Sequence, residues 1–400
     1  MNSLCQYCCG ESHKSINKPC QDYAYAESSE QLSMAIVSDG HGGERYFRSQ
    51  YGSEIAVKVT ADAIRAFVDN MEQSSLMPRG KRSVFDDAPF TAYSSALAIE
   101  QTGHKVAHKA LQWLFSHIIT QWNLLIARHA RENALSEWEL EHVERQYQEE
   151  FIGMLQSEEA SFEKTYGCTL MAYVQTPTYW FAFHLGDGKC VLMRLENQKL
   201  VCEQPIPWDE KCFLNKTTSL CDSNALEEFR YCYQGNGEFP QAVFLGSDGV
   251  DDSYGDGENL NDFYIRLFKL IIRKGEQAAA KELRKSLPLI SKIGSKDDMS
   301  VACVYNDSHP EKVFKYLTDY QQELLLDVIV STKEKEKQLV EKIASYGHVG
   351  NLNQSQVINR KYAENDLRKI MALEAKLKKK LIALKGEITR FNNRNKKDNK

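Results

Sequence analysis

The sequence predicts an α+β fold in which strands and helices form one large domain, followed by a helical extension. Six short apolar runs, each of a length typical of strands and bounded by Gly, Asp or Pro, lie before about residue 306. They are LSMAIV, CTLMAYV, YWFAFHLG, KCVLMRL, QAVFLG and MSVACVY. Stretches with helical periodicity lie between the first run and the second.

Two segments in this interval are expected to be helical. The first is SEIAVKVTADAIRAFVDNM, and the second is the long stretch from Ala110 to Gln156. In the second, apolar side chains recur three and four positions apart, as an amphipathic helix requires: Leu111, Leu114, Phe115, Ile118 and Ile119. Residues 72–95 are expected to form a loop. We therefore expect a helical insertion at about residues 100–160.

From about residue 308 the strand pattern ends and two helices are predicted, separated by GHVGNLNQSQ. One set of positions in the second helix alternates three and four apart and is apolar except at Glu374. It comprises Leu367, Ile370, Glu374, Leu377, Leu381, Leu384, Ile388 and Phe391. Such a heptad seam needs a partner helix. The partner is either the preceding helix, folded back as a hairpin, or another protein, including a second copy in a coiled coil. The predicted domains are residues 1–307 and 308–400.

The end of the chain, KLKKKLIALKGEITRFNNRNKKDNK, is strongly basic. It is either a docking patch for nucleic acid or an acidic partner, or a solvated helix face with a basic tail. Because aromatic residues are not interleaved with the charges, the second interpretation is favoured and nucleic acid is not an expected partner.

Composition is that of an ordinary soluble protein, with 42% hydrophobic and 26% charged residues and a net charge of -5. The N-terminus lacks the apolar core of a signal peptide, and no run approaches the roughly 18 apolar residues of a membrane span. We expect a cytoplasmic protein without membrane contact. The eleven cysteines are expected to be reduced thiols. Cys5, Cys8 and Cys9 form one tight cluster, which is interpreted as thiols on a first strand rather than a zinc site because no second pair of ligands stands at the right spacing.

Five segments place an Asp at one end of an apolar strand, and in all of them except the first the Asp stands next to Gly or another Asp. They are PCQDYAYA (Asp22), AIVSDGHGG (Asp39), FHLGDGKCVL (Asp187), VFLGSDGVDDSYG (Asp248, Asp251, Asp252) and GSKDDMSVACV (Asp297, Asp298). Five such segments in one domain suggest carboxylates gathered at the same sheet edge. They can share a site only if cations neutralise them, and hard oxygen ligands favour Mg²⁺ or Mn²⁺.

In this order the segments resemble the signature motifs of the type 2C metal-dependent Ser/Thr protein phosphatases. The match runs from about residue 10 to residue 306, and DGHGG with four companions in order is a specific signal. The resemblance implies two packed, mostly antiparallel β-sheets flanked by helices, with the metal ions in a cleft at one end. It also implies a variable flap over the site, at about residues 201–240.

The resemblance assigns roles position by position. Asp39 would bridge two metal ions, the carbonyl oxygen of Gly40 would supply a further ligand, and Asp22 would bind one ion directly or through water. Asp248 and Asp297 would hold the other ion. Asp187 and Asp252 correspond to positions where some bacterial members bind a third, looser ion. His41 corresponds to the proposed general acid, whereas Asp251 and Asp298 are interpreted as turn or capping groups.

These roles fit the chemistry of phosphoester hydrolysis. Two divalent ions roughly 3.5 to 4 Å apart can turn a bridging water into a nucleophile and clamp an in-line displacement at phosphorus. A nearby imidazolium can protonate the leaving Ser or Thr oxygen. Direct attack by water requires no phosphoenzyme.

Two positions depart from the family pattern. The family usually has an Arg before its first acidic pair to grip the substrate phosphate, whereas GESHKSINKPCQD offers only His13, Lys14 and Lys18. A lysine binds phosphate as a point charge and lacks the bidentate geometry of Arg. The usual Glu of the acidic pair is replaced by Gln21.

The leading hypothesis is a phosphoserine/phosphothreonine phosphatase that uses Mg²⁺ or Mn²⁺, two ions and a third looser one. Its expected partners are a phosphorylated protein and a Ser/Thr kinase, because microbial members of the family often oppose such a kinase. One alternative is a catalytically weak scaffold that binds a partner through its helical extension. Another is a phosphatase of small phosphoesters.

Overall fold

The computed structural model describes residues 1–71, 84–85, 90–93, 105–158, 160–212, 216–235, 237–347 and 353–398. The chain divides into two compact units. The first comprises Met1–Arg194 and Val201–Ser308, and the second comprises Leu195–Leu200 and His309–Lys400.

Two β-sheets form the centre of the fold, and the neighbouring strands whose register is defined run antiparallel. One sheet has five strands in the order β1 (Asn2–Cys8), β11 (Met299–Tyr305), β10 (Ala242–Gly246), β7 (Lys189–Glu196) and β8 (Lys199–Glu203). The other has six, in the order β2 (Asp22–Ser28), β3 (Ser33–Asp39), β5 (Leu170–Gln175), β6 (Trp180–Leu185), β9 (Arg230–Gln234) and β4 (Phe90–Tyr93). The predicted pair of antiparallel sheets is confirmed.

Alternation along the strands separates the core into layers, because successive side chains of a strand point to opposite faces. Ala35 and Val37 of β3 belong to the cluster between the sheets, together with Val243 and Leu245 of β10. Ile36, between Ala35 and Val37, instead joins the cluster on the outer face of the six-stranded sheet. Strands buried on both faces explain why the sequence shows nearly continuous apolar runs.

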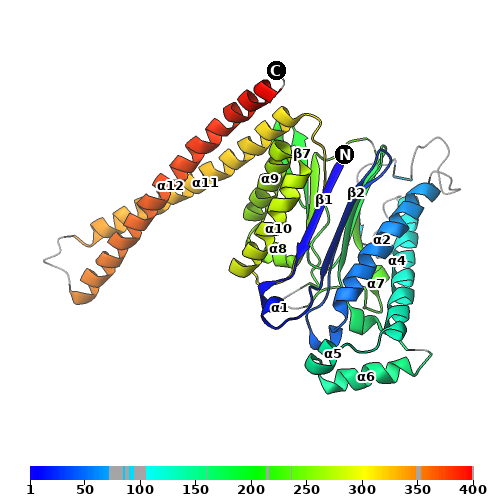
Figure 1. The fold of residues 1–400 in the computed structure, drawn as a ribbon. Coiled ribbons are helices and arrows are strands. Elements are labelled where there is room, and N and C mark those ends of the chain that lie inside the picture. The colour runs from blue at the N-terminus through cyan, green and yellow to red at the C-terminus, as the bar shows by residue number, and fades with distance from the viewer. Residues whose placement is uncertain are drawn as a thin grey trace. The chain divides into compact units, whose positions relative to one another are not determined.

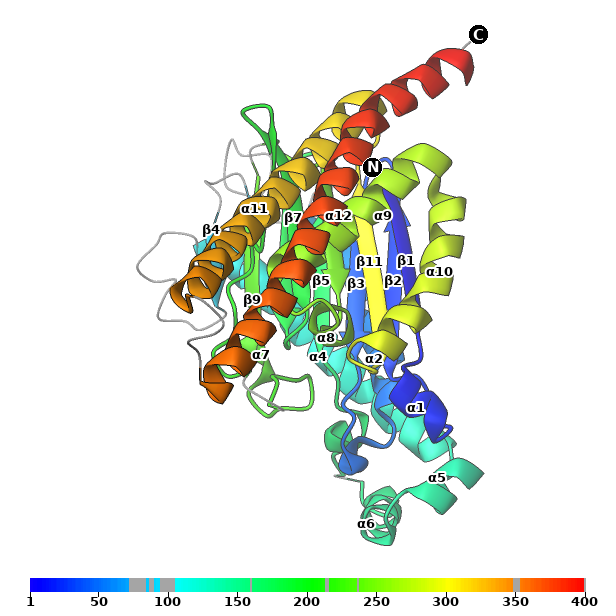
Figure 2. The ribbon, with the colours of Figure 1, turned by 90° about the vertical axis from the view of Figure 1, so that its left-hand side faces the viewer.

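Helices cover both outer faces of the sandwich (Figure 1 and Figure 2). On the six-stranded sheet lie α2 (Ser49–Met71) and α4 (Lys105–Glu132). On the five-stranded sheet lie α9 (Gly257–Lys274) and α10 (Glu276–Ile293). Phe244 of β10 stacks on Tyr264 of α9 with ring centroids 4.8 Å apart, and Phe268 of α9 contacts Tyr305 of β11.

Short helices complete the first unit. They are α1 (Glu11–Ser15), η1 (Glu44–Tyr46), α5 (Glu137–His142), α6 (Arg145–Leu155), η2 (Glu163–Tyr166), α7 (Ala225–Glu228) and α8 (Asp248–Asp252). The expectation of a loop over residues 72–95 is wrong at Phe90–Tyr93, which adds to the free edge of β9 as strand β4. The segment FTAY is rich in residues that favour strands, but a strand of four residues gives too short a pattern to recognise. Most of the remaining loop lies outside the described residues.

The second unit contains two long helices, α11 (Pro310–Ser345) and α12 (Gln354–Asp398). Phe314, near the start of α11, stacks on Phe391, near the end of α12, with centroids 4.2 Å apart, so the helices pack antiparallel. The seam of α12 lies on the inner face, because all its positions are buried or half-buried. Leu377, Leu381 and Leu384 pack against α11 residues. Of the two alternatives for the partner helix, the hairpin is the one observed.

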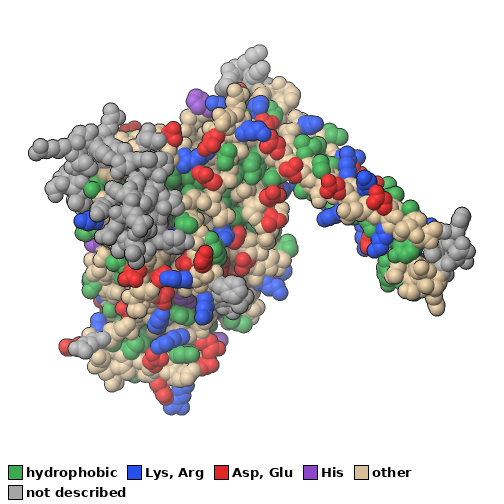
Figure 3. Space-filling view, turned by 180° about the vertical axis from the view of Figure 1, so that it is seen from behind, with side chains coloured by type: hydrophobic (Ala, Val, Ile, Leu, Met, Phe, Trp, Pro, Cys, Tyr) green, Lys and Arg blue, Asp and Glu red, His purple; other side chains and the backbone are tan. Residues whose placement is uncertain are grey.

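The surface of this hairpin carries hydrophobic, basic and acidic side chains interspersed (Figure 3). Among the helices that the structure describes, none combines the length and the apolarity that crossing a membrane requires.

Candidate metal centre

The centre of the site is the pairing of β2 with β3. The register of this antiparallel pair places Asp22, the first residue of β2, directly opposite Asp39, the last residue of β3. Asp22 is buried and Asp39 is half-buried. Two carboxylates predicted from separate motifs are therefore brought together by a backbone ladder.

The segment that leads into β5, Gly167 to Thr169, fixes the backbone around Asp39 through hydrogen bonds. The Thr169 amide donates to the Asp39 carbonyl oxygen at 2.8 Å, and the Thr169 hydroxyl accepts from the Asp39 amide at 3.0 Å. The His41 amide donates to the Gly167 carbonyl oxygen at 3.0 Å. A Cβ at Gly40 would lie 2.8 Å from the carbonyl oxygens of Gln21 and Ser49, so only glycine fits there.

The second carboxylate group comes from the five-stranded sheet. Asp248 is the first residue of α8 and stands two positions after the end of β10, and Asp297 stands two positions before the start of β11. A Cβ at Gly249 would lie 2.0 Å from the carbonyl oxygen of Asp298, so α8 packs directly on the backbone of this segment. The close approach brings the Asp248 and Asp297 segments together.

A cavity of about 760 Å³ lies over these residues. Its lining includes most of the predicted metal ligands, namely Asp39, Gly40, Asp187, Asp248, Asp252 and Asp297. Asp22 is not part of the lining. His41, Gln21 and Asp298 also line the cavity, whereas His13, Lys14 and Lys18 do not. The structure thus brings the predicted carboxylates together and places the predicted phosphate-binding cations outside the cavity.

The electrostatics of the carboxylates indicate a site built for cations. Burial, reinforced by the charges of Asp298 and Asp248, raises the pKa of Asp22 well above its ordinary value. Burial and the charges of Asp22 and Asp248 do the same to the pKa of Asp39. Burial, with the charges of Asp187 and Asp297 among others, raises the pKa of Asp248 to about 7. Each shift reflects an acid crowded by like charges and lacking water.

Unpaired oxygen atoms give an independent fit test for metal ions. Both carboxylate oxygens of Asp22 and Oδ1 of Asp248 are buried and have no hydrogen-bond partner among the described residues. Within the same part of the chain, the amide oxygen of Gln21 is also buried and unpaired, while its nitrogen donates to the His41 carbonyl oxygen at 3.1 Å. Buried oxygens without donors are costly unless a cation coordinates them. The residues present therefore fit hard divalent ions such as Mg²⁺ or Mn²⁺.

His41 lies at the cavity wall with its ring edge-on to Tyr46 at 4.8 Å. Its Nε2 is 2.7 Å from the Ser219 hydroxyl, which is also 3.0 Å from the Cys168 carbonyl oxygen. Burial lowers the pKa of His41 to about 4, although the charge of Asp222 opposes it. The neutral imidazole is therefore favoured in the protein alone, whereas the predicted general acid requires the imidazolium.

The predicted phosphate-binding residues have other partners. His13 Nδ1 lies 2.9 Å from Asp298 Oδ2. Lys18 Nζ donates to the carbonyl oxygen of Gly42 at 2.9 Å, beside the cavity. Asp298 also accepts from the amides of Gly10 at 2.6 Å and Gln21 at 2.5 Å, as expected of a capping group.

Sequence reasoning missed two cations in the cavity lining, Lys211 and Lys216. Both come from the predicted flap, where a lysine in KCFLNK carries no motif that would have marked it. Lys211 Nζ binds both carboxylate oxygens of Glu228 at 2.6 Å. Lys216 is exposed and has no side-chain partner among the described residues.

Comparison with known proteins gives a match to one protein family. A family model described as protein phosphatase 2C matches residues 9–288. No curated protein matches the chain. Among solved structures, the catalytic domain of the serine/threonine phosphatase PstP in complex with two manganese ions is 13% identical, with a TM-score of 0.38, over 76% of this chain and 96% of that one.

Two further solved structures illustrate the range of the matches. A serine/threonine phosphatase of S. agalactiae is 13% identical, with a TM-score of 0.36, over 76% of this chain and 98% of that one. A C. elegans sex determining protein is 14% identical, with a TM-score of 0.41, over 79% of this chain and 67% of that one. Because the family model covers well over half of the sequence, the chain belongs to the protein phosphatase 2C family.

Proposed function

We propose that this protein is a metal-dependent phosphatase that hydrolyses phosphoserine and phosphothreonine in proteins. The observation that carries the proposal is the set of buried, unpaired oxygens of Asp22 and Asp248 in a group of carboxylates with raised pKa values. When bound, two Mg²⁺ or Mn²⁺ ions would neutralise the phosphoryl charge and activate the attacking water.

The protein's own residues would hold those ions from two sides. Asp22 and Asp39, with the carbonyl oxygen of Gly40, would bind from the six-stranded sheet, and Asp248 and Asp297 from the five-stranded sheet. Asp187 and Asp252, which also line the cavity, would hold a third and looser ion. The two hydrogen bonds between Thr169 and the Asp39 backbone would keep Asp39 in position while ions and substrate exchange.

His41 is proposed to protonate the leaving oxygen of the substrate. The neutral form is favoured in the protein alone, but a phosphate dianion in the cavity would stabilise the imidazolium and raise its pKa. The Ser219 hydroxyl would orient the ring through Nε2.

Lys216 is proposed to take over part of the role of the absent Arg. It lines the cavity and is exposed, whereas the charge of Lys211 is balanced by Glu228. Lys18 would act indirectly, by holding the backbone at Gly42. In this proposal the flap at about residues 201–240 contributes to phosphate binding.

The test is hydrolysis of p-nitrophenyl phosphate and of a phosphothreonine peptide with Mn²⁺ or Mg²⁺. We expect turnover of both, and a loss of at least about 100-fold in Asp39→Asn, because even indirect support of a metal ligand is worth 10- to 100-fold. Asp62→Asn, an exposed position on α2, is the matched control and should be unchanged.

Three outcomes separate the hypotheses. Turnover of the peptide that depends on metal and on Asp39 supports the proposal. Turnover of the small ester alone would favour a phosphatase of small molecules. Absence of metal-dependent turnover in the intact protein would favour the scaffold alternative, in which the helical extension binds a partner.

A further inference from the structure

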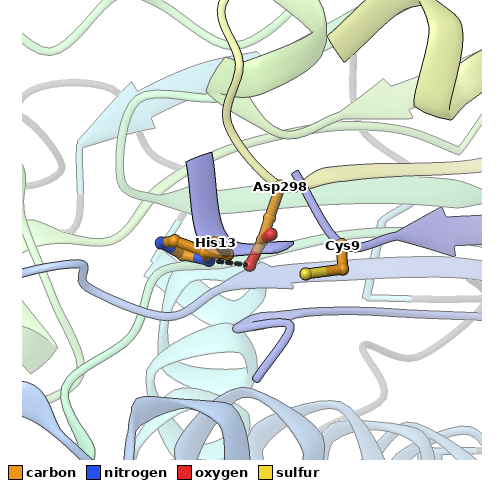
Figure 4. A group of neighbouring side chains, drawn as sticks. All are labelled: Cys9, His13 and Asp298. Atoms are coloured by element: carbon orange, nitrogen blue, oxygen red, sulfur yellow. Dashed lines mark hydrogen bonds and ion pairs between the residues drawn. The ribbon is translucent and has the colours of Figure 1, made fainter. Parts of the chain in front are cut away.

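A second cluster of metal-binding side chains lies beside the carboxylate site. Cys9 Sγ, His13 Nδ1 and a carboxylate oxygen of Asp298 all lie within 4.8 Å of one another. Figure 4 shows the Cys9 sulfur and the His13 ring on either side of the Asp298 carboxylate. We propose that these three residues form a separate site for a borderline-soft divalent ion of the Zn²⁺ class.

The chemistry of the donors distinguishes this cluster from the carboxylate site. It offers one sulfur, one imidazole nitrogen and one carboxylate oxygen, a set that suits Zn²⁺ and is unlike the all-oxygen set that suits Mg²⁺ or Mn²⁺. Three protein ligands leave a fourth position open for water, as in many zinc sites with three ligands.

The geometry requires only small movements. Tetrahedral Zn²⁺, with bonds of about 2.0 to 2.3 Å, holds its ligand atoms roughly 3.3 to 3.7 Å apart. His13 Nδ1 and Asp298 Oδ2 are now 2.9 Å apart, and no pair in the cluster exceeds 4.8 Å. Shifts of about 1 Å or less bring the three atoms to these separations, a range that the side chain of Cys9 can cover by rotation.

Two backbone amides hold the Asp298 carboxylate in place. Its Oδ1 accepts the Gly10 amide at 2.6 Å and its Oδ2 the Gln21 amide at 2.5 Å. Four lone-pair sites are available on a carboxylate, so one on each oxygen remains after these two bonds. The ion would replace the hydrogen bond from His13 and leave both amide bonds intact.

The backbone segments that carry the ligands are fixed to one another. The Ser12 amide donates to the Lys296 carbonyl oxygen at 3.0 Å, and the Glu11 amide donates to the Ser291 hydroxyl at 3.1 Å. These hydrogen bonds connect α1, which carries His13, to the segment that leads into Asp298. Such preorganisation lowers the cost of binding.

The test uses Co²⁺ as a probe of the full chain in the presence of excess Mg²⁺. A cysteine ligand gives a sulfur-to-cobalt charge-transfer band in the near ultraviolet, which the all-oxygen site cannot produce. We expect a band that saturates at one Co²⁺ per chain. Cys9→Ser should abolish it, and His13→Gln should weaken Co²⁺ affinity at least about tenfold.

The controls make the assignment specific. Cys5 lies on β1, the strand that ends just before Cys9, and Cys5→Ser should keep the band. Asp39→Asn, which disables the carboxylate site, should also keep it, so the result does not depend on the proposed phosphatase activity. In the unmodified protein, Zn²⁺ should protect Cys9 from alkylation, read by peptide mass spectrometry. Absence of the band, its survival in Cys9→Ser, or alkylation of Cys9 unaffected by Zn²⁺ would overturn the proposal.

Discussion

Lys216 is the residue whose proposed role is easiest to isolate. It lines the cavity and is exposed, and it has no hydrogen-bond or ion-pair partner for its side chain among the described residues. We expect Lys216→Gln to raise KM for the phosphothreonine peptide about three- to tenfold with little change in kcat, because an exposed ammonium contributes on the order of 1 kcal/mol. Lys216→Arg should retain KM near that of the unmodified protein.

Steady-state kinetics with Mn²⁺ check this expectation. The matched control is Lys58→Gln, an exposed lysine on α2. If Lys216→Gln lowers kcat and leaves KM unchanged, the residue acts on the chemical step and not on phosphate binding.

At the scale of residues, the sequence could predict what depends on short motifs. The motif DGHGG identified Asp39 and Gly40 as candidate metal ligands, because the resemblance to the family rests on this short segment. The partner of His13 could not be predicted, because Asp298 is 285 residues away and meets it only after β1 and β11 pair. Lys216 could not be predicted either, since its place at the cavity depends on the path of the flap.

At the scale of elements, the helical insertion is tied to the loop that follows His41 by a buried ion pair. Arg48 Nε lies 2.6 Å from Glu139 Oε1, and both side chains are almost fully buried. Arg48 also donates to the carbonyl oxygens of Asn133 and Ala134. Glu139 in turn closes a capping box with Ser136 at the start of α5.

Breaking this pair should be costly. We expect Glu139→Ala to lower the free energy of unfolding by about 3 to 5 kcal/mol, because it leaves the Arg48 charge buried without its partner. Glu150→Ala is the matched control, since Glu150 pairs with Arg45 at 2.8 Å between the same two regions but both side chains are about half exposed. It should cost about 1 kcal/mol or less. If urea unfolding shows the same loss of unfolding free energy in both variants, the buried ion pair does not stabilise the protein more than the exposed one.

The hairpin of α11 and α12 gives a second test at this scale. Leu384 is 8% exposed and packs against α11, whereas Leu373 on the same helix is 46% exposed. We expect Leu384→Lys to destabilise the hairpin by about 2 to 5 kcal/mol, seen as an earlier loss of helical circular dichroism on heating. Leu373→Lys should change stability by no more than about 0.5 kcal/mol. If the two variants melt alike, the seam does not close within the chain.

For the heptad seam of α12, the sequence could predict the buried face but not the partner helix. The periodicity in α12 identified the inner face, because that depends only on spacing along one helix. The choice between a hairpin and another protein as partner could not be made from spacing, since an apolar stripe is satisfied equally by either. In the structure Phe314 of α11 packs on Phe391 of α12, so the partner helix is α11.

At the scale of the whole molecule, we expect the carboxylate site to make the free energy of unfolding depend on pH and on metal. An acid whose pKa is raised by folding binds more protons folded than unfolded, so stability falls as pH rises from its unfolded pKa to its folded one. For Asp248 that window runs from 3.8 to about 7, and the raised pKa values of Asp22 and Asp39 act in the same direction. The pKa of Asp298 is lowered, because the bonds from His13 and the backbone outweigh its burial, so its effect falls below this window.

The metal-free protein should therefore lose stability between about pH 4 and pH 7, and Asp248→Asn should remove part of that loss. One pKa unit corresponds to 1.36 kcal/mol, so we expect Asp248→Asn to be about 1 to 3 kcal/mol more stable than the unmodified protein at pH 7 without metal, and equally stable near pH 4. Mn²⁺ at about 100 times its Kd should restore about 2.7 kcal/mol to the unmodified protein but much less to the variant. Urea unfolding in chelator and in Mn²⁺ measures both effects, with Asp62→Asn as the exposed control. A metal-free Asp248→Asn protein that is no more stable at pH 7 would show that the crowded carboxylates do not oppose folding, and the case for a site that requires cations would lose its physical basis.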